Sequence, residues 1–130
     1  MSILIKNGRI ITPADDFIGD IFVKGETIAA IGENLAFDAD QVIDASGKLV
    51  FPGGIDPHVH LDMPFMGTFS SDDYSTGTLA AMHGGTTMVI DFVLQTQGRP
   101  LREALETWQK KSLGKAYGDY SCLLYTSDAA

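Results

Sequence analysis

The sequence predicts an α/β chain in two parts, an all-β part over residues 1–52 and a part of alternating strands and helices over residues 53–121. Three observations predict this division. Short apolar runs separated by turn residues fill the first part, a Phe-Pro-Gly-Gly step at residues 51–54 ends it, and strand-like runs alternate with helical patterns beyond it. Such an alternation is typical of parallel βαβ units.

Six short runs in the first part have the composition and length of strands. Asn7-Gly8 favours a type I′ turn, so the first two runs are expected to form a tight hairpin. Ala45-Ser46-Gly47 predicts another hairpin between the last two runs. The spacing favours a small β-sandwich or barrel, and no catalytic residue types cluster here, so this part is interpreted as a structural module. The runs are residues 3–6, 9–12, 17–24, 27–32, 41–44 and 48–51.

The second part opens with an expected strand over residues 54–60. A helix is predicted over residues 70–84, because Ser70-Ser71-Asp72-Asp73 supplies an N-cap and Gly84-Gly85 a left-handed end. The run at residues 86–92 is β-branched and mostly apolar, which is typical of a strand covered on both faces.

A second helix is predicted from Pro100 to a terminator at Gly114. Its apolar side chains recur at i, i+3, i+4 and i+7 and therefore share one face. A third strand is expected to begin at Asp119. The apolar residues that define the helical face are Leu101, Ala104, Leu105 and Trp108.

Composition excludes several classes of protein. Nine Lys and Arg against 17 Asp and Glu give a net charge of −8, which disfavours nucleic acid and anionic membranes as partners. A single Cys cannot form an internal disulfide. The sequence contains no signal-peptide pattern and no apolar run near the ~18 residues of a membrane span, so a cytoplasmic location is expected.

The length of the chain limits the interpretation of the second part, and the last nine residues need an interpretation of their own. A complete (β/α)₈ barrel needs about 250 residues. Residues 53–121 read like the opening of such a barrel, and the chain is too short to complete it. Residues 122–130 resemble the peptide that results when a transposase adapter from DNA library preparation is read in frame. We interpret them as a non-native tail, the alternative being an ordinary strand and turn.

The chemistry is concentrated at the end of the strand expected over residues 54–60, in Asp56-Pro57-His58-Val59-His60. Alternate side chains of a strand share a face, so His58 and His60 are expected to project together. Two imidazoles in this arrangement converge on one metal ion such as zinc. The alternative is that the two histidines occur together by chance and are hydrogen-bonded in a polar pocket without a metal ion. The carboxyl end of a barrel strand, where catalytic groups sit, favours the metal.

A family resemblance rests on the same stretch. Residues 51–61, Phe-Pro-Gly-Gly-Ile-Asp-Pro-His-Val-His-Leu, resemble the first-strand signature of cyclic amidohydrolases in the metal-dependent amidohydrolase superfamily. Residues 62–68 and 84–92 are similar to dihydropyrimidinases and bacterial hydantoinases. Dihydroorotases and allantoinases usually have an Arg-Glu-Pro-Gly type of segment where this chain has Leu61-Asp62-Met63-Pro64.

The resemblance implies the amino-terminal fragment of an enzyme with a β-sandwich, a (β/α)₈ barrel and two zinc ions. His58 and His60 would bind one ion. A carboxylated lysine, two further histidines and a late Asp of the family have no counterpart here. A metal-bound hydroxide would open a dihydropyrimidine or 5-substituted hydantoin ring to an N-carbamoyl amino acid, as in pyrimidine catabolism. The complete protein is expected to be a homotetramer, and the fragment itself inactive.

Three more residues are site candidates. Phe65 is expected to contact the ring substituent of the substrate, with packing against a neighbouring subunit as the alternative. Asp62 is a candidate to support a ligating histidine, against plain loop solvation. Asp91, at the end of the second barrel strand, is a candidate for the same supporting role, with packing as the alternative.

Two other functions are compatible with the same fold. Non-enzymatic scaffold proteins share the dihydropyrimidinase fold but lack the His-x-His pair that this chain has. Cyclic amidases of the allantoinase or dihydroorotase type are the other alternative, and the segment after His60 argues against them.

Overall fold

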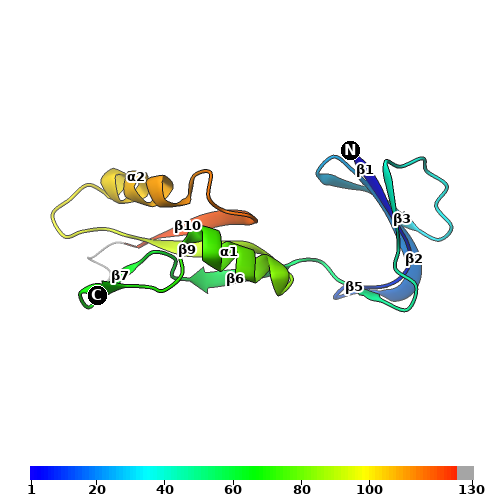
Figure 1. Cartoon of the computed structure of the whole chain (residues 1–130), viewed down its shortest axis with the longest axis horizontal. Helices are drawn as coiled ribbons and strands as arrows, with labels where there is room; N and C mark the ends of the chain where they lie inside the picture. Colours follow the sequence, from blue (N-terminus) through cyan, green and yellow to red (C-terminus); the bar gives the residue numbers. More distant parts are fainter. Residues whose placement is uncertain (126–130) are drawn as a thin grey trace. The chain divides into compact units, whose positions relative to one another are not determined.

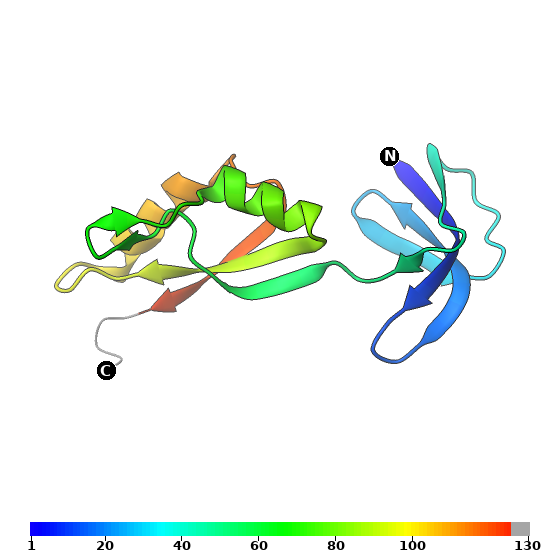
Figure 2. The same cartoon turned by 60° about the horizontal axis from the view of Figure 1, so that its bottom comes forward.

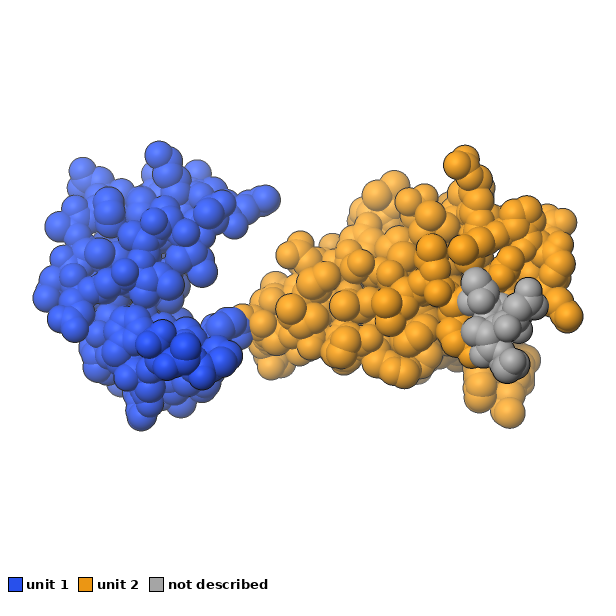
Figure 3. Space-filling model, turned by 180° about the vertical axis from the view of Figure 1, so that it is seen from behind, with its two compact units in different colours: residues 1–52 blue, residues 53–130 orange. Residues whose placement is uncertain are grey.

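A computed structural model describes residues 1–125 of the chain, which is a mixed α/β structure. The chain divides into two compact units, unit 1 over Met1–Pro52 and unit 2 from Gly53 onward. Figure 3 colours the two units separately. Each unit is described by itself below.

Unit 1 is one five-stranded sheet with the strand order β3-β2-β1-β4, in which β5 also pairs with β1. The pairs β1–β2 and β2–β3 are antiparallel. Leu4, Ile10, Ile21 and Phe22 are buried, and Phe22 stacks on Phe37 with ring centroids 4.5 Å apart. The strands are β1 (Ser2–Ile11), β2 (Asp16–Lys24), β3 (Thr27–Gly32), β4 (Gln41–Asp44) and β5 (Leu49–Val50).

The hairpin predicted at Asn7-Gly8 is wrong, because β1 runs through this dipeptide without turning. Its register with β2 shifts between Ile5 and Gly8, so one extra residue is accommodated as a bulge. Asn7 adopts φ 61°, the left-handed conformation that a type I′ turn also requires. The carboxylate of Asp20 accepts the Asn7 N–H at 2.8 Å, which satisfies an amide that the bulge withdraws from the ladder.

The second predicted hairpin is also wrong. β4 and β5 do not pair with each other, and both pair with β1 in parallel. The turn at Ala45-Ser46-Gly47 therefore carries the chain along β1 instead of reversing it. Ala45 N–H donates to the Lys6 carbonyl and Arg9 N–H donates to the Lys48 carbonyl, so hydrogen bonds to β1 continue across the turn.

Unit 2 contains a three-stranded sheet with the order β10-β9-β6, and both strand pairs are parallel. The predicted parallel βαβ units are therefore confirmed. Helices α1 and α2 cover the same face of the sheet (Figures 1 and 2), as successive right-handed crossovers require. The elements are β6 (Gly54–Val59), α1 (Tyr74–His83), β9 (Thr86–Leu94), α2 (Leu101–Ser112) and β10 (Asp119–Tyr125).

The helix predicted over residues 70–84 begins later, at Tyr74, because Asp73 and not Ser70 caps it. The Asp73 carboxylate accepts N–H groups from Ser75 and Thr76, and the Thr76 hydroxyl accepts the Asp73 N–H in return. The helix ends at Gly84-Gly85, where Gly85 adopts φ 87°. This placement puts Tyr74 in the first turn, fully buried with Leu61 and Val89 between the helices and the sheet.

The tail contributes to the sheet as far as the structure describes it. Residues 122–125 belong to β10, which pairs with β9 through Tyr125 and Leu94. Residues 126–130 lie outside the described residues, and the non-native origin of 122–130 stays a prediction. Within residues 1–125, no helix combines the length and the apolar character that a membrane crossing requires.

Candidate metal centre

The two histidines stand at the carboxyl end of β6, where that strand stops pairing regularly with β9. The register between the two strands shifts between Asp56 and Val59. The Asp56 carboxylate accepts the His58 N–H at 3.1 Å, which caps the local bend around Pro57. Both histidine side chains are exposed, and their ring centroids lie 5.0 Å apart.

The two ring nitrogens converge as two ligands of one ion would. His58 Nε2 and His60 Nε2 are 3.1 Å apart. Two nitrogens on a tetrahedral zinc ion, with Zn–N bonds of 2.0–2.1 Å, are separated by about 3.3 Å. The same separation fits an N–H···N hydrogen bond between the rings. The pair therefore suits a metal, with one ring proton to be displaced when the ion binds.

Phe92 of β9 packs against both imidazoles. Its ring centroid lies 4.6 Å from that of His58 and 5.4 Å from that of His60. Successive side chains of a strand point to opposite faces. Phe92 therefore faces the histidines while its neighbour Asp91 faces helix α1. The candidate centre lies on the face of the sheet that the helices leave open.

The second nitrogen of His60 also has a partner. Its Nδ1 lies 2.9 Å from the sulfur of Met63. A proton on Nδ1 directed at this weak acceptor leaves Nε2 free to bind a metal ion. The segment that follows His60 thus helps to orient its ring.

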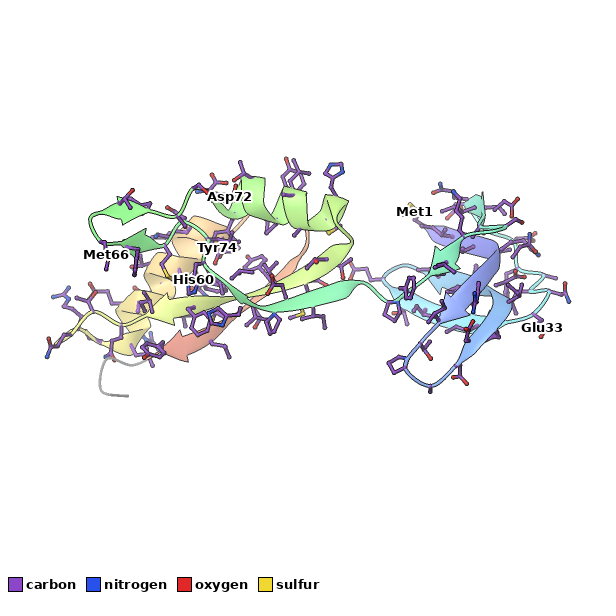
Figure 4. All side chains as sticks on the ribbon, turned by 90° about the horizontal axis from the view of Figure 1, so that it is seen from below. Met1, Glu33, His60, Met66, Asp72 and Tyr74 are labelled. Carbon is purple, nitrogen blue, oxygen red and sulfur yellow. The ribbon has the colours of Figure 1, made fainter. Side chains whose placement is uncertain are left out.

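A pocket of about 540 Å³ adjoins His60. A small hairpin, β7 (Pro64–Phe65) and β8 (Thr68–Phe69), forms much of its wall. Figure 4 shows Met66 at the tip of this hairpin, where Met66 and Gly67 both have positive φ, as a type I′ turn requires. The side chains lining the pocket are mostly apolar: His60, Met63, Phe65, Thr68, Phe69, Ser70 and Leu94.

The structure brings Phe65 into this pocket with His60, although Phe65 remains 65% exposed. Asp62 lies elsewhere, with its carboxylate 3.8 Å from Lys111 Nζ. Its role in supporting a histidine stays a prediction. His83, the third histidine, is the last residue of α1 and is exposed.

Asp91 is buried, with 1% of its surface exposed, and its carboxylate accepts the Tyr74 hydroxyl and the Phe92 N–H. Burial, together with this bond to Asp91, raises the pKa of Tyr74 far above its ordinary value. Burial and the Asp91 charge also raise the pKa of the Cys122 thiol. Any effect of Asp91 on the histidines would pass through Phe92, and its supporting role stays a prediction.

Sequence reasoning missed Phe92, Met63 and Tyr74 as neighbours of these groups. Phe92 and Tyr74 gave no signal, because an aromatic residue in a buried strand or helix is ordinary core. Met63 follows His60 by three residues. This spacing allows a contact between the two side chains but does not indicate that Met63 orients the imidazole ring. Within residues 1–125, no group of three or more His, Cys, Asp or Glu residues is placed to hold a metal ion. The pair supplies two ligands.

Comparisons with known proteins place this sequence among hydrolases of one family. Residues 41–117 match the model of a family described as the amidohydrolase family. The chain is 52% identical over 128 residues to a D-hydantoinase of Geobacillus stearothermophilus, covering 98% of this chain and 27% of that protein. It is 44% identical over 126 residues to the dihydropyrimidinase of Rattus norvegicus, covering 92% and 24%.

Solved structures give the same result. The crystal structure of dihydropyrimidinase from Brevibacillus agri NCHU1002 superposes with a TM-score of 0.95 at 50% identity. The superposition covers 99% of this chain and 28% of that one. The chain thus spans about a quarter of the length of the relatives that it matches.

Proposed function

The chain belongs to the amidohydrolase family, within its dihydropyrimidinase and D-hydantoinase group, and from this membership we propose that it is the amino-terminal part of a metal-dependent cyclic amidohydrolase. The reaction is the hydrolytic opening of a 5,6-dihydropyrimidine or a 5-substituted hydantoin to an N-carbamoyl amino acid. One observation carries the proposal: two imidazole nitrogens 3.1 Å apart beside an apolar pocket.

The residues of this chain have separate tasks in that reaction. His58 and His60 would hold one zinc ion, because their Nε2 atoms lie 3.1 Å apart. A zinc ion supplies Lewis-acid chemistry, which lowers the pKa of a water molecule and polarises a carbonyl group. Phe92 fixes the planes of both imidazoles, and the Asp56 carboxylate fixes the backbone that carries His58.

The apolar pocket receives the substituent of the substrate ring. Met63, Phe65 and Leu94 line it and exclude water from the ring substituent. The ring itself lies over the histidines, because His60 belongs to both the pocket and the metal pair. A cyclic amide or ureide with an apolar substituent is therefore the substrate class that this wall suits.

The remaining ligands, with a second zinc ion and a carboxylated lysine, come from chain beyond these residues. The three parallel strands of unit 2 are the first strands of a (β/α)₈ barrel, and the sheet of unit 1 is part of a β-sandwich. The complete protein is a cytoplasmic homotetramer. The His58–His60 pair favours an enzyme over a scaffold protein of the same fold.

Ring opening by the product of the extended gene tests this function. The complete protein, in which the native sequence continues after residue 121, is expected to hydrolyse dihydrouracil or a 5-substituted hydantoin, and the 130-residue chain is expected not to. A catalytic zinc ion usually has three protein ligands, and this chain offers two. The function is wrong if the extended protein opens neither ring, or if it keeps its turnover after His58→Ala and His60→Ala.

A further inference from the structure

Lys111 of α2 reaches across to the start of the pocket hairpin. Its ammonium group donates a hydrogen bond to the main-chain carbonyl of Asp62 and lies 3.8 Å from the carboxylate of the same residue. It also lies over the ring of Phe69, 5.7 Å from the centroid. One cation thus contacts both ends of the hairpin, although 49 residues separate Lys111 from Asp62.

Apart from Lys111, the hairpin is tied to the segment before α1 by the Asp62 N–H, which donates to the Asp72 carbonyl at 2.8 Å. Its base is closed by bonds within itself: Met63 N–H to the Ser70 hydroxyl at 2.9 Å, and Ser70 N–H to the Met63 carbonyl at 2.9 Å. Its apolar side chains face solvent, with Met66 90% exposed. Among residues 1–125, one hydrogen bond joins residues 62–70 to a residue later in the sequence than residue 76. That bond is the one from Lys111.

We infer that Lys111 is a positioning residue that pins the β7–β8 hairpin, and with it the wall of the pocket beside His60. Asp62 adopts φ 48°, in the left-handed region, and its main-chain carbonyl accepts the bond from the ammonium group. A bond from a charged donor is roughly twice as strong as a neutral one. Lys111 is not among the residues that line the pocket, and it acts through the placement of Met63 and Phe69, which do line it.

This inference deepens the proposed function. That the pocket receives a ring substituent rests on the proposed function, whereas the pinning of its wall is a property of the chain itself. Lys111 would thereby set which substituents fit, without contacting any of them.

Hydrogen exchange of the 130-residue chain, followed by mass spectrometry, tests the pin. In Lys111→Met, amides of residues 62–73 are expected to exchange at least tenfold faster, while those of β6, β9 and α2 change less than twofold. Lys111→Arg keeps a cationic donor and is expected to stay within threefold of the parent chain. Lys110→Met is the matched control, because Lys110 is the exposed neighbour on the same helix.

The inference is overturned if Lys111→Met leaves the exchange of residues 62–73 unchanged. It is also overturned if exchange rises equally throughout unit 2, since that marks general destabilisation. Should Lys111→Met fail to fold, Lys111→Ala, which also removes the donor, decides by the same criteria. Zinc binding by the parent chain is measured alongside, so that a missing metal site contradicts the proposed function and leaves the pin standing.

Discussion

Replacing Tyr74 by Phe is expected to lower the free energy of unfolding of unit 2 by about 3 kcal/mol. The Tyr74 hydroxyl donates to the buried Asp91 carboxylate. Its removal leaves that carboxylate with the Phe92 N–H as its remaining donor among residues 1–125. An unsatisfied buried polar group costs about 1–3 kcal/mol, and a charged one more. Trp108, the single tryptophan of the chain and part of the same cluster, reports urea unfolding by its fluorescence.

The pH dependence of the stability of unit 2 gives a second test of the Tyr74–Asp91 bond. Because the pKa of Tyr74 is raised in the folded chain, the phenol ionises first in the unfolded chain. Its contribution to stability is therefore complete below pH 10 and is lost as the pH rises beyond about 10. This alkaline loss is expected to be smaller in Tyr74→Phe than in the parent chain.

Two further variants decide whether the Tyr74–Asp91 bond is the cause. Tyr117→Phe removes an exposed hydroxyl from the same unit and is expected to leave the urea midpoint unchanged. Adding Asp91→Asn to Tyr74→Phe removes the stranded charge and is expected to recover part of the loss. A midpoint for Tyr74→Phe equal to that of Tyr117→Phe would show that the buried bond adds nothing.

Replacing Asp20 by Asn is expected to destabilise unit 1 by about 2 kcal/mol. The buried Asp20 carboxylate accepts the Asn7 N–H at 2.8 Å and the Leu35 N–H at 2.9 Å, and Lys6 Nζ lies 3.4 Å away. An amide has one oxygen, so one of these buried donors would face another donor. Native-state hydrogen exchange of the β1 and β2 amides measures the loss.

Acid provides the check on this second prediction. The Asn7 N–H bond chiefly, with Leu35 and Lys6, lowers the pKa of Asp20 below its ordinary value. Its stabilisation is therefore present above about pH 4 and is lost as the pH falls through the lowered pKa. Asp20→Asn is expected to flatten this acid loss. Asp16→Asn, which alters an exposed pair with Arg9, is the control and should leave the exchange of β1 nearly unchanged.

The βαβ order of unit 2 was predictable because its signals are local. The Asp73 cap, the Gly84-Gly85 end and the apolar face of the second helix each depend on neighbours within a few residues. Parallel pairing then follows, because a helix between two strands returns the chain to the same end of the sheet.

In unit 1, the local sequence signals do not predict how the strands pair. Asn7 adopts the left-handed conformation that Asn-Gly favours, yet it sits in a bulge, because Asp20 from the next strand accepts its amide. The parallel pairing of β4 and β5 with β1 joins residues that are 38 to 40 positions apart in the sequence. The turn residues between these strands carry no signal of that pairing.

The site divides in the same way. The His-x-His spacing predicts the convergence of His58 and His60, because His58 lies in β6 and His60 follows directly after its last residue. Phe92 and Lys111 come from other elements, and their contacts depend on the packing of β9 and α2. An aromatic residue in a strand and a lysine near a helix end carry no sign of such roles.

Zinc binding by the 130-residue chain tests the central claim, that His58 and His60 hold one metal ion between them. Titration against a chromophoric zinc indicator should show one ion per chain, held at least tenfold more weakly after His58→Ala and after His60→Ala. His83→Ala, which alters the remaining histidine of the chain, should bind as the parent does. Equal affinities in all three variants, or no binding by the parent chain, would contradict the account.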